Sequence, residues 1–84
     1  MKYQVVIQKR ALKVLEKINE PDYSKIKSFL FSLAGNPRPH GYKKLKNRDG
    51  YRVRIGDYRI IYDIIDNLLV VEVIAIGHRK DVYN

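Results

Sequence analysis

The first 35 residues contain one short apolar run followed by two segments with helical periodicity. Tyr3 to Ile7 is rich in β-forming side chains and predicts a strand. From Gln8 to Asn19, apolar residues recur at helical spacing, which predicts a helix whose buried stripe is Ala11, Leu12, Leu15 and Ile18. Glu20-Pro21-Asp22 interrupts this helix and opens another that reaches Gly35, with the stripe Ile26, Phe29, Leu30 and Leu33. We expect the two helices to form an antiparallel pair.

From Tyr51 onward the pattern changes to a two-residue alternation, which is typical of strands buried on one face. Gly56-Asp57 and Asp66-Asn67 each offer a two-residue turn, so this half predicts two consecutive hairpins. In that register Ile55 faces Tyr58, and Ile65 faces Leu68. The face expected to lie under the helices carries Tyr51, Val53, Ile55, Tyr58, Ile60, Tyr62, Ile64, Leu69, Val71, Val73 and Ala75. The opposite face carries Arg52, Arg54, Arg59, Ile61, Asp63, Ile65, Leu68, Val70, Glu72, Ile74 and Ile76.

These elements predict one α+β domain over residues 1–84, since 84 residues suffice for a single core. Its order is β-α-α-β-β-β: an N-terminal strand, then two antiparallel helices packed on a mainly antiparallel meander sheet. Residues 40–49 form a basic connector, which we expect to be a solvated loop containing one short strand.

The composition of the chain indicates its cellular compartment and the class of partner that it binds. There is no cysteine, which excludes disulfides and thiolate metal sites and favours the reducing cytoplasm. The N-terminal residues lack the pattern of a signal peptide, and Asp63, Asp66 and Glu72 interrupt the longest apolar stretch, so no membrane span is expected. A formal net charge of +8 favours a polyanionic partner, with nucleic acid first.

The first hairpin places like charges directly opposite each other. Arg54 faces Arg59, with Arg52 two residues away on the same face. Like charges at such positions destabilise a sheet by up to about 1 kcal/mol, so the arrangement indicates a bound anion. The second hairpin brings the tail that begins at Gly77 beside the same turn, where a bulge or bend at Gly77 would turn Arg79 onto the arginine face.

At these residues the chain resembles the RelE/ParE superfamily, the toxins of type II toxin-antitoxin modules. The resemblance spans nearly the whole chain and is carried by the element order, by Tyr51-Arg-Val-Arg-Ile-Gly-Asp-Tyr-Arg-Ile-Ile-Tyr62 and by Gly77-His-Arg-Lys-Asp-Val-Tyr83. For the RelE branch it implies an mRNA interferase that enters the ribosomal A site. Such an enzyme cleaves the message by attack of a ribose 2'-hydroxyl on the neighbouring phosphate, without a metal or another cofactor.

The resemblance also assigns roles to particular residues. The basic pair before the turn matches Arg52 and Arg54, the arginine after the turn matches Arg59, the late arginine matches Arg79, and the C-terminal tyrosine matches Tyr83, which would stack on or orient the attacked nucleotide. Much of the RelE branch has lysines at the first two positions. Arginine stays protonated in proteins, so here the pair would serve chiefly as a charge clamp.

A candidate for proton transfer and a group of RNA-contacting residues complete the expected site. His78 is the group in this cluster that titrates near neutrality, which makes it the candidate for proton transfer. The expected contacts to the RNA backbone are Lys43, Lys44, Lys46, Arg48 and Lys80. The implied partners are a cognate antitoxin, the ribosome with its mRNA and rRNA, and operator DNA reached through the antitoxin. No metal site is expected.

Two other functions fit the same residues. One is the ParE branch, in which the fold inhibits DNA gyrase and cleaves no RNA; the assembled arginines and Tyr83 argue against it. The other is a non-catalytic RNA-binding module, which the absence of an obvious general base favours.

Overall fold

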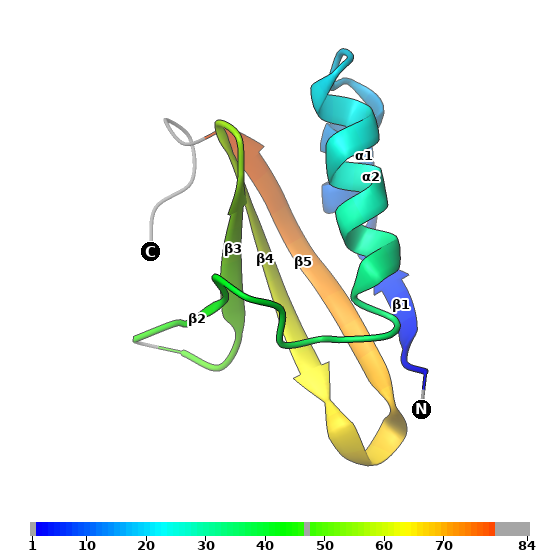
Figure 1. Ribbon diagram of the computed structural model, residues 1–84, viewed down its shortest axis with the longest axis vertical. Coiled ribbons are helices and arrows are strands. Elements are labelled where there is room, and N and C mark those ends of the chain that lie inside the picture. The colour runs from blue at the N-terminus through cyan, green and yellow to red at the C-terminus, as the bar shows by residue number, and fades with distance from the viewer. Residues whose placement is uncertain (1, 47, 79–84) are drawn as a thin grey trace.

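The computed structural model describes residues 2–46 and 48–78, which form a five-stranded mixed sheet with two helices on one face (Figure 1). The strands are β1 (Gln4–Ile7), β2 (Lys43–Lys44), β3 (Tyr51–Ile55), β4 (Tyr58–Ile65) and β5 (Val70–His78), and the helices are α1 (Lys9–Glu16) and α2 (Asp22–Ser32). The sheet order is β1-β5-β4-β3-β2. Strand β1 pairs parallel with β5, and all other pairs are antiparallel. The predicted α+β fold is therefore confirmed.

The helices pack as an antiparallel pair, with α1 behind α2 in Figure 1. Helix α1 is shorter than predicted because it ends at Glu16, although Ala11, Leu15 and Ile18 are buried as expected. Leu12 is 40% exposed, so its predicted place in the buried stripe is wrong. In α2 the residues Ile26, Leu30 and Leu33 are buried, and Phe29 is half-buried against them. Among the described residues, neither helix is long and apolar enough to cross a membrane.

The two hairpins differ in how well their register was predicted. In β3 and β4 every predicted pair is present, from Ile55 with Tyr58 to Arg52 with Ile61. In β4 and β5 the predicted register is wrong, because Ile65 pairs with Val70 instead of Leu68. The chain turns through a short 3-10 segment, Asp66–Leu68, and then through Leu69, whose φ of 53° lies in the left-handed region. This connection uses more residues than the expected two-residue turn.

A register shift within β5 also changes which side chains enter the core. Tyr62 pairs with Val73 but Ile61 pairs with Ala75, so Ile74 is an extra residue between these pairs. Beyond this point the faces exchange: Ile76 pairs with Ile60 and joins the core, whereas Ala75 lies beside Ile61 on the other face. The predicted faces of Ala75 and Ile76 are therefore wrong. The sheet irregularity lies here, upstream of Gly77, the residue at which a bulge was expected.

A connecting segment, residues 35–42, crosses from the end of α2 to β2 (Figure 1) and bonds once to strand β4 and once to the β4–β5 connection. The hydroxyl of the fully buried Tyr62 donates to the carbonyl of Pro37 at 2.9 Å. Burial raises the pKa of Tyr62 to about 12, so the phenol remains the donor at physiological pH. Further along, Arg38 donates from both terminal nitrogens to the carboxylate of Asp66, with a shorter distance of 2.9 Å. These two bonds hold the connecting segment against β4 and the β4–β5 connection before the chain enters β2.

The exposed Asp66 carboxylate makes the stability of this arrangement dependent on pH. Its bonds from Arg38, and next from Tyr3 at 2.6 Å, hold its pKa below the ordinary value of 3.8. A lowered folded-state pKa stabilises the fold above the unfolded value, and this stabilisation is lost as the pH falls through the folded value. We expect Asp66→Asn to be less stable than wild type at neutral pH, with the difference shrinking below pH 3.8. Urea unfolding from pH 7 to pH 2 measures this. Asp49→Asn, which changes another exposed carboxylate, is the control, and a pH-independent difference for Asp66→Asn would contradict the assignment.

Candidate active site

The candidate site begins at the β3–β4 hairpin, where the turn dictates the arrangement of the arginines. Gly56 has a φ of 58° in the two-residue turn, a conformation that glycine adopts without steric cost. This turn sets Arg54 directly opposite Arg59, as predicted. The Cα atoms of opposed residues in an antiparallel pair lie about 4.5 to 5.5 Å apart. Two guanidinium groups therefore start from neighbouring positions on the same face.

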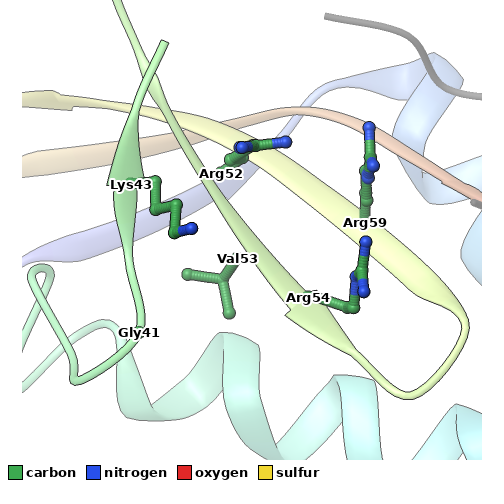
Figure 2. Close-up of a pocket in the computed structure, with 6 residues that line it drawn as sticks. All are labelled: Gly41, Lys43, Arg52, Val53, Arg54 and Arg59. Carbon is green, nitrogen blue, oxygen red and sulfur yellow. The ribbon is translucent and has the colours of Figure 1, made fainter.

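Strand β2 adds a third side to this cluster. Lys43 pairs with Arg52, and the backbone N–H of Leu45 donates to the carbonyl of Gly50 at 3.0 Å, which closes the turn between β2 and β3. The result is an open pocket of about 270 Å³. Its lining is Gly41, Lys43, Arg52, Val53, Arg54 and Arg59 (Figure 2). Four of these residues are cationic and none is acidic.

The side chains approach the pocket from two directions. Figure 2 shows Arg54 and Arg59 beside each other near the hairpin turn, while Lys43 extends from β2 toward the space above Val53. Within residues 2–46 and 48–78, the side chains of Lys43, Arg52 and Arg54 form no ion pair with an acidic group. Several uncompensated cations in one hollow attract a polyanion and favour bidentate contacts to phosphate oxygens.

The other predicted site residues lie elsewhere. His78 pairs with Tyr58 and places its ring edge-on to the Tyr58 ring at 5.5 Å, and Tyr58 packs against the core. His78 is thus on the face of Tyr58 and does not line the pocket, and its proton-transfer role remains a prediction. Lys44, Lys46 and Arg48 are exposed but also absent from the lining. Arg79, Lys80 and Tyr83 lie outside the described residues.

Two features of the site were missed in the sequence. Gly41 and Val53 line the pocket although neither carries a charge, and Lys43 lines it although it was assigned only to the RNA backbone. A two-residue strand is too short to show alternation, so no pattern indicated that Lys43 and Lys44 face different ways. The structure places Lys43 through its pairing opposite Arg52, beside the Leu45–Gly50 hydrogen bond, and no local sequence pattern indicates this pairing.

A row of tyrosines borders the pocket strands. The Tyr42 and Tyr51 rings are 5.6 Å apart and the Tyr51 and Tyr62 rings 5.9 Å apart, measured between centroids. The guanidinium of Arg38 lies 5.9 Å from the Tyr51 ring centroid. These contacts join the connecting segment to the start of β3, so they hold the pocket strands in place from the face opposite the arginines. No cluster of three or more potential metal-ligating side chains occurs in the described part of the chain.

Comparison with models of known protein families shows which family this chain belongs to. The family described as the ParE toxin of the type II toxin-antitoxin system parDE matches residues 5–83. The chain belongs to the RelE/ParE toxin superfamily. The resemblance noted in the hairpin and the tail is therefore confirmed.

Relatives of this superfamily toxin carry RelE names. The present chain is 31% identical to the mRNA interferase toxin RelE of Escherichia coli K12 over 82 residues, which cover 95% of this chain and 86% of the relative. A chain in the archaeal RelE-RelB complex from Pyrococcus horikoshii matches with a TM-score of 0.81 at 27% identity, covering 98% of this chain and 100% of that one. A chain in the intact E. coli RelBE toxin-antitoxin complex matches with a TM-score of 0.78 at 29% identity, covering 90% and 95%.

Proposed function

We propose that this protein is a ribosome-dependent endoribonuclease that cleaves mRNA in the A site and thereby inhibits translation. The observation that carries the proposal is the pocket at the β3–β4 hairpin, whose described lining gathers four cationic side chains and no acidic one. Similarity to proteins named mRNA interferase RelE supports the same reaction.

The pocket suits the charge changes of RNA cleavage by a neighbouring 2'-hydroxyl. As the 2'-oxygen attacks phosphorus, negative charge grows on the two non-bridging oxygens. Arg54 and Arg59 lie side by side and offer paired N–H donors to these oxygens, while Arg52 binds the adjoining backbone. Donors that are fixed before the reaction and aimed at developing charge make one of the largest contributions to enzymatic rate enhancement. Arg79 and Tyr83 complete the proposed site, as the resemblance implies.

The chemistry of the pocket lining supports the proposed dependence on the ribosome. Among the described residues, this lining contains no histidine and no carboxylate, so it presents no ordinary general base for the 2'-hydroxyl. In-line attack then relies strongly on holding the 2'-oxygen against phosphorus, and positioning alone can supply roughly 7 to 11 kcal/mol of a barrier. We propose that the ribosome imposes this geometry on the A-site codon, and that exposed Lys44, Lys46 and Arg48 contact RNA backbone around it.

We further propose that a cognate antitoxin restrains the protein in the cytoplasm and that their complex reaches operator DNA through the antitoxin. A RelE-RelB complex is described from P. horikoshii and a RelBE toxin-antitoxin complex from E. coli, which supports an antitoxin partner. The net charge of +8 suits a partner that presents acidic side chains.

A second candidate function is inhibition of DNA gyrase without RNA cleavage. The observation that favours it is the match to the ParE family over residues 5–83. The four-cation pocket has no specific role in this alternative, which is why we place RNA cleavage first.

Primer extension on a defined message in a purified translation system tests the proposal. With ribosomes, the wild-type protein is expected to produce cuts inside A-site codons; without ribosomes, the message is expected to remain intact. A gyrase supercoiling assay on the same preparation covers the alternative. If the message stayed intact under translating conditions, the proposed nuclease activity would be overturned. If the same preparation also abolished supercoiling by gyrase, the ParE-like function would be established.

A further inference from the structure

Lys43 differs chemically from every other pocket residue. The lining consists of a glycine, a valine, three arginines and this one lysine. Arginine stays protonated in proteins, whereas a lysine ammonium can give up a proton and take it back. Among the described residues that line the pocket, Lys43 is therefore the one side chain able to transfer a proton.

The position of Lys43 is determined by its strand. Lys43 pairs with Arg52 and Lys44 pairs with Tyr51, so the two lysines point to opposite faces of the sheet. Lys43 lines the pocket and Lys44 does not. Figure 2 shows the Lys43 side chain reaching toward the middle of the pocket, across from Arg54 and Arg59. A phosphate held by these two arginines would lie in the pocket that Lys43 also lines.

We propose that Lys43 is a catalytic residue that protonates the leaving 5'-oxygen, an inference that rests on the proposed RNA cleavage. In this step the 2'-oxygen forms a bond to phosphorus and releases its proton to solvent. The bond between phosphorus and the 5'-oxygen breaks, and the electron pair left on that oxygen takes a proton from the Lys43 ammonium. Solvent then reprotonates the amine. The products are a 2',3'-cyclic phosphate and a 5'-hydroxyl, with no net gain or loss of protons.

The other residues of the cluster fit this role less well. Arg52 carries a guanidinium, which stays protonated in proteins and does not donate its proton to a leaving oxygen. The ring of His78 packs against Tyr58, outside the pocket lining. Lys43 thus provides, from the neighbouring strand, the exchangeable proton that the arginines do not.

The test compares two leaving groups in single-turnover cleavage on programmed ribosomes. One message has the normal 5'-oxygen at the cut site and the other has sulfur in that bridging position, which leaves as a thiolate and needs no proton. For Lys43→Arg, which keeps the positive charge but replaces the ammonium with a guanidinium that does not release its proton, we expect a loss of about 10² to 10⁴-fold on the oxygen substrate. Most of this loss should disappear on the sulfur substrate.

Lys25→Arg makes the same chemical change on the exposed surface of α2, outside the pocket lining, and its sulfur-to-oxygen rate ratio should equal that of wild type. Full activity of Lys43→Arg on the oxygen substrate would overturn the proposal, and so would an equal loss on both substrates. A wild-type protein that cuts neither message would instead refute RNA cleavage itself. The two failures are therefore distinguishable. Lys43 is exposed, so its replacement should leave the urea-unfolding curve unchanged and report on chemistry alone.

Discussion

Replacing Arg54 with alanine is expected to lower the single-turnover rate of mRNA cleavage by about 10² to 10³-fold, the usual effect of removing one donor aimed at transition-state charge. Arg59→Ala should have a loss of the same order, because Arg59 is paired with Arg54, lines the same pocket and is proposed to bind the same phosphate. Arg54→Lys should recover only part of the rate, since lysine keeps the charge but loses the paired N–H donors. The measurement is the rate of A-site cleavage at saturating protein. Lys25→Ala, which removes an exposed cation from α2, is the control and should cleave at the wild-type rate.

The same Arg54 variant should not weaken the fold. Arg54 lies opposite another arginine and forms no ion pair among residues 2–46 and 48–78, so removing it relieves repulsion. We expect the free energy of unfolding to be unchanged or to rise by up to about 1 kcal/mol. A clear loss of stability in Arg54→Ala would show that the arginine pair serves the structure, and the functional interpretation of the pocket would then fail.

Replacing Ile60 with alanine should have the opposite effect: it should lower the free energy of unfolding and leave the cleavage rate of the folded protein nearly unchanged. Ile60 is adjacent to Arg59 in β4 but is fully buried in the core beneath the helices. Deleting so much buried side chain from a packed core costs about 2 to 5 kcal/mol. In a domain of 84 residues this is a large share of the total stability. Urea unfolding at low temperature measures the change.

Cleavage by the folded fraction of Ile60→Ala should stay near the wild-type rate, because the arginine face is unaltered. Ile60→Val is the conservative comparison and should cost about 0.5 to 1.5 kcal/mol, the usual range for this replacement. If Ile60→Ala abolished cleavage while remaining fully folded, the separation of the hairpin into a core face and a chemical face would be wrong.

The success of the sequence prediction depended on the type of turn. Gly56-Asp57 is a two-residue turn with glycine at a positive φ, and it fixed every pair of the first hairpin. The second hairpin turns through Asp66–Leu68 and Leu69, and a leucine at a positive φ leaves no recognisable pattern in the sequence. The extra residue at Ile74 then exchanged the faces of Ala75 and Ile76. Alternation alone does not reveal where such a shift occurs.

The candidate site was predicted where it lies on one hairpin and missed where it depends on distant segments. Arg52, Arg54 and Arg59 follow from the β3–β4 register, so they were identified together. Lys43 lies in a two-residue strand, which follows the connecting segment whose Arg38 bonds to Asp66. Those two residues are 28 positions apart, and no local pattern links them.

Cleavage of a message with one altered sugar shows whether the pocket promotes attack by a ribose 2'-hydroxyl. The message carries a single 2'-deoxynucleotide on the 5' side of the mapped cut and is compared with the all-ribose message on the same ribosomes. We expect the deoxy message to stay intact at that position, while the ribose message yields a 2',3'-cyclic phosphate and a 5'-hydroxyl. Cleavage of the deoxy message at an unchanged rate would contradict this mechanism, because the reaction would then proceed without the 2'-oxygen.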